Sequence, residues 1–528
     1  MRSPHFIVSA AAVLLTLQAC GTQGLIAEEQ SFLLASSSGN FQESARPADL
    51  KGDDAEPLGS TMTLESLQAQ SVQKQQQKEP PTISVQPAAE PSPALRLKFY
   101  PPKWQRKPDQ AVLHFSRAML LANQIPAEAR KLWQSEEWQT DNGNGKSPSD
   151  KELGDAVGGL ASVFAELHAM AISEDFTFDH RLRDIRGAAV YEYLLPDVQE
   201  ARTLARLLKL QIRHQRQQRD FDGAVASISD GIRLAEFVGQ GEGLIQQLVG
   251  IAVAGMMRDE ITLLIQTEGC PNLYWALASI PRPLISVSDS IQWELHNLAQ
   301  VFPMLEESTQ GIWSQQTADE KWRSLTEGIQ KLSWGDSSDS LLAMAVIGAT
   351  QTENARQRLL QSGFPASQLN QMPQLQILLL DTHHEVHRLG DEAGKAQLLP
   401  PAMAMQLGIQ QQKQFQTWLR EHQLTSVSGI LAGLLFPSVI QGQEAGLRCT
   451  LGFDRLMTLE ALRMHAATHD GQLPATLEEL APVPAMLDPY TNRPFEYSVT
   501  EKDGHRIVTL KAAGPATWKA LQILKVQF

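Results

Sequence analysis

The chain has little cysteine: Cys20, Cys270 and Cys449 are the three thiols among 528 residues. No CxxC pair occurs, which excludes a zinc ribbon and a thioredoxin-type redox site. No G-x-S-x-G motif occurs either, so the nucleophile elbow of the α/β-hydrolases is absent. Cys270 and Cys449 can pair in an oxidising compartment or stay two buried free thiols, and the sequence leaves both alternatives open.

Positive charge and long apolar runs are also scarce. The 45 Lys and Arg against 59 Asp and Glu give a formal net charge of −14, which repels phosphate backbones, so we expect no nucleic-acid partner. Residues 429–440 form an apolar stretch of about 12 residues that contains Pro437. It is too short to cross a bilayer and indicates a core helix.

The first twenty residues predict export. A positively charged start precedes an apolar stretch over residues 6–17, and Ala19 precedes Cys20. This length is typical of a signal peptide and too short for a membrane span. The string LQACG at 17–21 resembles a bacterial lipobox, which implies that residues 1–19 are a lipoprotein signal peptide and that Cys20 is lipidated. Each buried methylene contributes about 0.8 kcal/mol, so two or three acyl chains hold essentially permanently.

This resemblance implies a location in the cell envelope, with the protein lipid-anchored on the periplasmic side. Gly21, rather than an acidic residue, follows Cys20. By similarity to other lipoproteins, this favours the outer membrane. The alternative is a secreted or periplasmic protein whose ordinary signal peptide is cut elsewhere.

Composition divides the rest of the chain. Residues 20–94 predict a disordered tether, because the part at 68–93 is rich in Gln, Pro and Ser and cannot bury enough apolar surface to offset chain entropy. A linker of ~70 residues spans roughly 40–50 Å. Residues 95–440 predict a helical array, and residues 441–528 a helix followed by a β-hairpin segment.

Apolar residues recur at helical spacing through the array. They predict helices over 202–217, 223–238 and 244–266, separated by short breaks. Helices of this length joined by tight turns are the unit of a tetratricopeptide stack, but no strict 34-residue period is present. We therefore expect a mostly α fold: an irregular tetratricopeptide-like helical array with a small C-terminal α+β hairpin appendix.

The C-terminal pattern is more mixed. It predicts a helix over 458–469 ended by Asp470 and Gly471, and a short helix over 474–480. Alternating residues predict strands over 495–500 and 507–511, joined by a turn at Asp503-Gly504.

Two blocks resemble known families. Residues 95–294, and above all the string NLYWALASIPRP at 272–283, resemble an uncharacterised family of large secreted α-helical planctomycete proteins. This resemblance implies secretion and a helical fold, and it brings no activity. Residues 459–497 occur in the same family and resemble the C-terminal segment of type II secretion major pseudopilins, with DGQLP followed by DPYTNRPFEY. The long apolar pilin helix is absent, so a borrowed fold element is implied. Tyr274 and Trp275 are expected to pack between helices.

One histidine group suggests metal chemistry. His383 and His387 are four residues apart and share a helical face, with His384 beside them. Such spacing can hold zinc. The alternative is an amphipathic helix with histidines at the border of its apolar stripe, because the sequence fixes only two of the four ligands of a structural zinc site.

The leading functional hypothesis is therefore an envelope lipoprotein that acts as a non-enzymatic helical scaffold or protein-binding module. Its expected partners are the membrane, through Cys20, and an envelope protein or peptide. No catalytic residue and no cofactor are assigned. The alternative is an envelope hydrolase with a metal site near His383 and His387, since catalytic groups converge in space rather than along the chain. The pseudopilin resemblance alone supports a third hypothesis, an accessory of a secretion apparatus.

Overall fold

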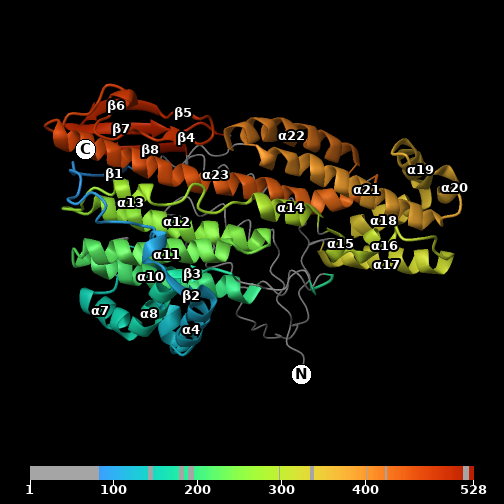
Figure 1. Ribbon diagram of the computed structural model, residues 1–528, viewed down its shortest axis with the longest axis horizontal. Coiled ribbons are helices and arrows are strands. Elements are labelled where there is room, and N and C mark those ends of the chain that lie inside the picture. The colour runs from blue at the N-terminus through green and yellow to red at the C-terminus, as the bar shows by residue number, and fades with distance from the viewer. Residues whose placement is uncertain are drawn as a thin grey trace, which may run out of the picture.

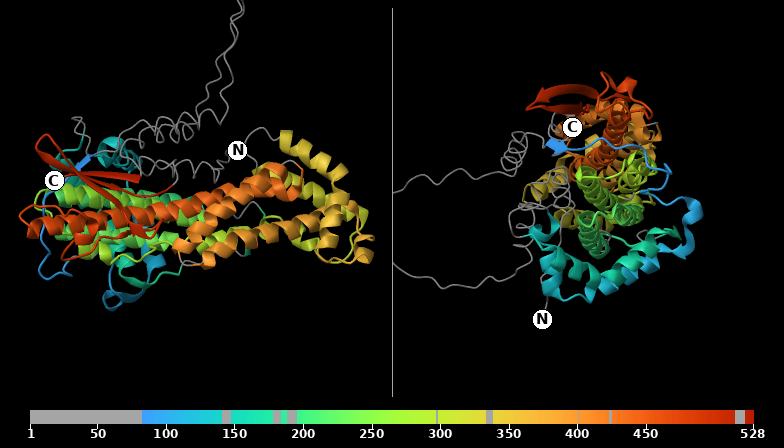
Figure 2. Two further views of the ribbon diagram at one scale, coloured as in Figure 1. Left: turned by 90° about the horizontal axis from the view of Figure 1, so that it is seen from above. Right: turned by 90° about the vertical axis from the view of Figure 1, so that its left-hand side faces the viewer.

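One long helix forms the axis of the molecule. A computed structural model describes residues 82–140, 147–177, 184–187, 195–296, 298–332, 338–399, 401–422, 425–514 and 522–528. In it, α23 (Val427–Thr468) has 42 residues, so it is about 63 Å long at 1.5 Å per residue. Figure 2 shows α23 running along much of the elongated body. Among the described residues, no helix combines the length and apolar character needed to cross a membrane.

The ends of α23 follow from the sequence. Ser426 precedes the helix, and its side chain accepts a hydrogen bond from the backbone N–H of Gly429, which is a helix N-cap. At the other end Asp470 and Gly471 have φ values of 49° and 79°. The N–H of Gly471 returns to the carbonyl of Ala466 at 2.8 Å. The predicted stop is thus confirmed, although the helix begins far before residue 458 and crosses the predicted boundary at 440.

Two hydrophobic cores lie along this axis. The N-terminal end of α23 contributes Val427 and Leu431 to one core, and the rest of the helix contributes residues such as Leu459 and Leu462 to the other. Helix α21 (Gln374–Gly394) also contacts both, with Ile377 in the first and Leu389 in the second. These two helices join the two halves.

The larger core contains the three helices that the apolar spacing predicts. They are α10 (Leu195–Gln217), α11 (Phe221–Gly239) and α12 (Leu244–Gln266), which pack on one another, with α12 against α23. Gly250 allows α11 and α12 to approach closely, because a Cβ there would lie 2.6 Å from the carbonyl oxygen of Ala235.

Smaller elements cover the outer side of α10 and α11 (Figure 1). They are η1 (Lys103–Gln105), β2 (Lys107–Gln110), α4 (Ala111–Asn123), α5 (Ala127–Trp133), α6 (Glu136–Gln139), α7 (Asp150–Gly159), α8 (Ala161–Ala171) and β3 (Ser173–Asp175).

The smaller core lies at the opposite end from the sheet (Figure 1). It is built by α21, by the start of α23 and by a series of mostly short helices. These are α15 (Leu298–Val301), α16 (Pro303–Glu307), α17 (Gln315–Leu332), α18 (Ser338–Thr350), α19 (Thr352–Gln361) and α20 (Ala366–Leu369). The preceding α14 (Ser288–His296) contributes Ile291 to the larger core. The short η3 (Lys395–Leu398) and α22 (Pro401–His422) then lead back to α23.

The sheet has the strand order β1-β8-β7-β6. Its strands are β1 (Thr82–Ser84), β6 (Glu496–Lys502), β7 (His505–Lys511) and β8 (Ile523–Gln527). The predicted hairpin is confirmed as β6 and β7, and its two turn residues, Asp503 and Gly504, have φ values of 53° and 78°. Before it lie β4 (Leu487–Asp488) and β5 (Arg493–Pro494), and the short helix expected over 474–480 is only η4 (Leu477–Glu479). The mostly helical fold with a small C-terminal α+β part is confirmed.

The N-terminal segment differs from the prediction. Residues 82–94 fall in the predicted tether, yet they are part of the body. β1 pairs in parallel with β8, and Ile83 and Val85 are buried. The N–H of Ala88 donates to the carbonyl of Arg463 at 3.1 Å. The prediction was wrong here because the segment is rich in Gln and Pro and contains only a few apolar residues. We call residues 82–100 the strap; residues 1–81 lie outside the described part.

A buried ion pair fixes the strap to α23. Glu460 and Arg463 are 0% and 1% exposed, and the Arg463 Nη1 atom lies 2.7 Å from Glu460 Oε1. The same guanidinium donates from Nε to the carbonyl of Gln86 at 2.8 Å, and from Nη2 to the carbonyl of Cys270 at 3.0 Å. One side chain therefore holds the strap and the loop before α13 (Tyr274–Ala278) on the same helix.

Glu460 and Asn272 complete this arrangement. The second carboxylate oxygen of Glu460 accepts the N–H of Leu273 at 2.6 Å. The Asn272 amide donates to the carbonyl of Glu460 at 2.8 Å and to that of Ala88 at 3.2 Å. The NLYW string and the C-terminal helix, which the sequence presents as separate blocks, thus bind each other. Tyr274 is buried, as its predicted packing role requires, and Trp275 donates to Glu90 at 2.6 Å.

Removal of the Arg463 side chain should strongly destabilise the protein. Arg463→Ala leaves the Glu460 carboxylate buried without its counter-charge, which costs about 3–5 kcal/mol. The control is Arg219→Ala, which breaks the Arg219–Glu268 pair, whose side chains are 61% and 69% exposed, and should change stability by less than about 1 kcal/mol. Guanidinium unfolding measures both variants, and equal losses would contradict the assignment.

Candidate functional site

The predicted histidines lie on α21, but only two of them meet. The ring centroids of His383 and His387 are 4.4 Å apart, whereas the ring of His384 packs edge-on against Phe364 at 5.8 Å. All three histidines are half-buried. The structure therefore supplies one pair of imidazoles at helical spacing, with the third directed to another neighbour.

The charge state of His383 is compatible with metal binding. Burial, together with His387 and His384, lowers the pKa of His383 to about 4, so its ring is neutral at pH 7. A structural zinc site needs four ligands. In the described ranges, no group of three or more His, Cys, Asp and Glu side chains is arranged to hold a metal ion. The metal site at His383, His384 and His387 thus stays a prediction, for which the structure brings two of the residues, His383 and His387, together.

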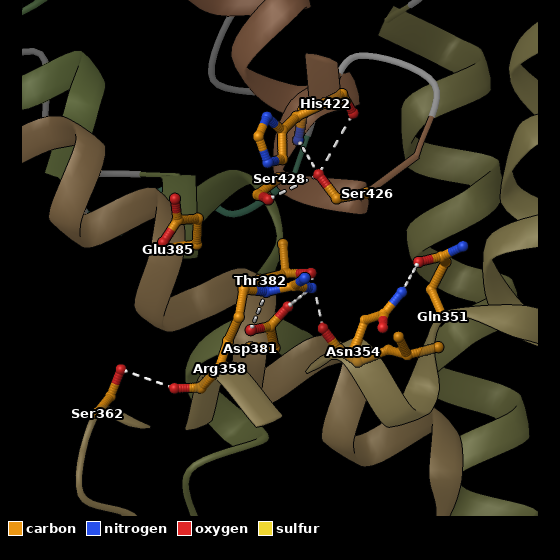
Figure 3. A network of polar contacts seen from close by, with 12 residues as sticks. Gln351, Asn354, Arg358, Ser362, Asp381, Thr382, Glu385, His422, Ser426 and Ser428 are labelled. Carbon is orange, nitrogen blue, oxygen red and sulfur yellow. Dashed lines mark hydrogen bonds and ion pairs between the residues drawn. The ribbon is translucent and has the colours of Figure 1, made fainter. Parts of the chain in front are cut away.

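An ion pair joins the buried Asp381, two residues before His383 on α21, to the half-buried Arg358 (Figure 3). The Arg358 guanidinium binds Asp381 through two contacts, Nε to Oδ1 at 3.0 Å and Nη2 to Oδ2 at 2.6 Å. Burial raises the pKa of Asp381, and Arg358 opposes that shift. Because Arg358 belongs to α19, this two-point contact holds α19 against α21.

Hydroxyl groups gather where α22 meets α23, in the upper part of Figure 3. Ser426 Oγ caps α23 and lies 3.1 Å from Ser428 Oγ. The His422 Nδ1 atom is 2.8 Å from the carbonyl of Trp418, and Thr382 donates to the carbonyl of Leu378 at 2.7 Å. A serine nucleophile needs a base within hydrogen-bond reach. The contacts of these serines are instead those of a helix cap, so their role here is structural.

The two described cysteines are free and buried, which decides between the alternatives left open by the sequence. Burial raises the pKa of Cys270 to about 12 and that of Cys449 to about 11. Since the thiolate is the nucleophile and the metal ligand, both are inert at neutral pH. Cys449 borders a cavity of about 10 Å³ beside Arg282 and Phe453, room for about one water molecule. Cys20 lies outside the described residues.

A histidine held between two carboxylates was not predicted from the sequence. His114, on α4, places Nδ1 2.6 Å from Glu166 Oε2 and Nε2 2.9 Å from Asp109 Oδ2. An ionised carboxylate only accepts hydrogen bonds, so both ring nitrogens donate and the imidazole is charged. The bonds to Asp109 and Glu166 raise the pKa of His114. The contact joins β2, α4 and α8.

A row of charged residues on α11 was also missed. Asp230 accepts from His168 Nδ1 at 3.1 Å; burial raises the pKa of Asp230, and Asp230 in turn raises the pKa of His168. One turn on, the buried Arg233 donates to the carbonyls of Ala171 at 2.9 Å and Ser173 at 3.1 Å. It thereby caps the C-terminal end of α8 with a positive charge.

The same guanidinium also fixes the strap. Arg233 lies 3.6 Å over the ring of Phe176, and it contacts Glu236 and the hydroxyl of Tyr100, a strap residue. Asp230, Arg233 and Glu236 occur every three residues in the second half of α11, where most other residues are apolar. This spacing could have indicated the three residues from the sequence, because residues three apart lie on one side of a helix and charged residues are rare on a buried side.

No protein family, curated protein or solved structure matches the chain. The resemblances to planctomycete helical proteins and to pseudopilins therefore stay predictions.

The stability that His114 contributes should depend on pH. Its folded pKa is raised above the ordinary value of about 6.5. The stabilisation is therefore fully present below about pH 6.5 and is lost as pH rises through the folded pKa. His114→Asn should cost about 1–2 kcal/mol near pH 6 and progressively less in alkaline buffer. Urea unfolding across this range, with the exposed His505→Asn as control, measures the effect; a pH-independent loss would contradict it.

Metal analysis tests the histidine pair. Stoichiometric metal in the purified protein, lost in His383→Ala and His387→Ala, would support the predicted site and the hydrolase alternative. With two ligands placed and no larger group described, we expect equal, substoichiometric metal in all three proteins, which would end that alternative.

Proposed function

We propose that this protein is an envelope lipoprotein that acts as a non-enzymatic helical scaffold or protein-binding module. The observation that carries the proposal is that charged side chains in the interior bind other parts of the same chain. Arg358 pairs with Asp381 on another helix. Arg463 and Arg233 pair with Glu460 and Glu236 on their own helices, and their remaining donors bind other segments of the chain. Charged groups that a catalyst would keep available to substrate are here occupied by internal bonds.

The buried thiols and hydroxyls support the same proposal. Catalytic groups have pKa values matched to proton or group transfer near the working pH. The shifts of Cys270 and Cys449 run the other way, away from a reactive thiolate. The Ser426 hydroxyl accepts the N–H of Gly429 and so caps α23. The roles of these residues are structural, which favours a scaffold over a catalyst.

The exposed surface fits a role in protein contact. Apolar side chains lie on outward helix faces at helical spacing, such as Leu342 and Val346 on α18, which are 66% and 49% exposed. Leu398 and Met403, near the start of α22, are 78% and 57% exposed. Exposed apolar side chains that lie close together favour contact with other proteins. The proposed partner is a protein or peptide of the envelope.

The proposed attachment is a lipid on Cys20, with the periplasmic face of the outer membrane favoured and secretion or the periplasm as the alternative. The predicted tether then connects Cys20 to the strap. Because β1 pairs with β8, such a tether enters the body at its sheet end.

Substitution of Cys20 should release the protein from the membrane. We expect full-length protein to incorporate labelled palmitate and to sediment with membranes, and Cys20→Ala to lose both properties, because the acyl chains supply the anchoring energy. Cys449→Ala is the matched control and should keep both. An unlabelled wild-type chain that retains its first nineteen residues would contradict the lipoprotein proposal.

Crosslinking in intact cells tests the binding role. Recovery of a second, defined envelope protein is expected. Repeated recovery of copies of this chain alone would contradict a role in binding another protein.

A further inference from the structure

Strand β6 lies at one edge of the sheet, and half of its backbone groups point away from its neighbour β7. Lys502 and His505 flank the two-residue turn, so they form a hydrogen-bonded pair, as do the alternate residues Thr500, Ser498 and Glu496 with their partners on β7. The N–H and C=O groups of the residues between them, Tyr497, Val499 and Glu501, therefore point away from β7. The bond from Phe528 N–H to the carbonyl of Arg506 confirms this alternation on the far side of β7.

In the part of the chain that the structure describes, β6 pairs with β7 alone, and the opposite edge of the sheet is formed by the three-residue β1. All residues of β6 are exposed except the half-buried Tyr497. Figure 1 shows β6 at the upper rim of the molecule. A seven-residue edge strand is a template for a further strand.

The sequence of β6 complements itself. In EYSVTEK, read antiparallel to a second copy about Val499, Glu496 lies opposite Lys502 at both ends. Ser498 lies opposite Thr500, and the two Val499 residues face each other. In this register the pairs that exchange hydrogen bonds are Val499 with Val499 and Tyr497 with Glu501. These residues are the ones whose backbone groups point away from β7. The charged pairs and the backbone hydrogen bonds therefore favour the same register.

We propose that a second copy of this chain pairs with β6 across a two-fold axis at Val499, giving one continuous sheet across a homodimer. The contact is isologous, as a two-fold axis requires. Edge strands commonly use charge to prevent such pairing. Here Glu496 and Lys502 have opposite signs and are symmetric about Val499, so they favour one register, while Glu501 lies opposite the uncharged Tyr497.

The side chains of β6 suit this contact. Val499 is 38% exposed and shares its face with the buried Val508 and Leu510, so the partner's Val499 would extend the core. Glu496 contacts Lys511 at 2.7 Å, but its side chain remains 74% exposed and is accessible to Lys502 of the second copy. Because β1 lies at the other edge, Thr82 of each copy would lie at an outer rim of the joined sheet.

Sedimentation velocity of the full chain carrying Cys20→Ala tests this pairing without lipid. We expect a dimer whose dissociation constant rises at least tenfold with Lys502→Glu, because Glu then faces Glu496 at both ends. Glu496→Lys combined with Lys502→Glu restores opposite charges and should restore the dimer. Lys525→Glu, on β8, makes the same charge change away from the edge and should leave the dimer intact.

A covalent test fixes the register. Directly opposite residues of a hydrogen-bonded antiparallel pair have Cα atoms about 5.5 Å apart, within the range of a disulfide. Val499→Cys should form a disulfide-linked dimer on oxidation, and Thr509→Cys, on the central strand β7, should not. A monomer at all concentrations, or a dimer weakened equally by Lys502→Glu and Lys525→Glu, would overturn the proposal. A disulfide from Val499→Cys to a different polypeptide, with the Cys20→Ala protein monomeric, would overturn it as well.

Discussion

The architecture depends on one buried ion pair, Glu460 with Arg463. Burying two charges is favourable only when their remaining hydrogen-bonding groups are also satisfied. Here the partners are the backbone groups of Gln86, Cys270 and Leu273. Two segments that are far apart in the sequence, the strap and the loop at 270–273, must therefore reach the same point on α23 before the charges are compensated. This requirement links formation of the strap to formation of the larger core.

The same solution recurs elsewhere in the body. Arg233 holds α8 and the strap to α11, and Asp381 with Arg358 holds α19 to α21. Ion pairs of this kind have specific geometry, whereas apolar packing alone tolerates many arrangements. We infer that the charged groups set which helices meet, and that the two hydrophobic cores supply most of the driving force. The proposed scaffold role would require this specificity, because it depends on surfaces held in fixed positions.

Local helices, turns and strands were predicted well from the sequence, whereas contacts between segments distant in the sequence were not. The limits of α11 and α12, the stop at Gly471 and the β6–β7 hairpin follow from apolar spacing and turn residues, which act over a few positions. The strap was taken for tether because its composition resembles a linker, and its order comes from contacts with Arg463 and Asn272, which are distant in the sequence. His114 and Asp230 were missed for the same reason. Of the predicted site, the structure pairs His383 with His387 and directs His384 elsewhere.

Hydrogen exchange of the strap tests most directly whether it belongs to the body. The amides of Val85, Ala88 and Phe99 are bonded to the carbonyls of Gln527, Arg463 and Ala276. If buried charge fixes the strap to α23, these amides should open only with the larger core and show protection comparable to that of α23. Exchange of residues 82–100 at the rate of an unstructured peptide, with α23 still protected, would contradict the account.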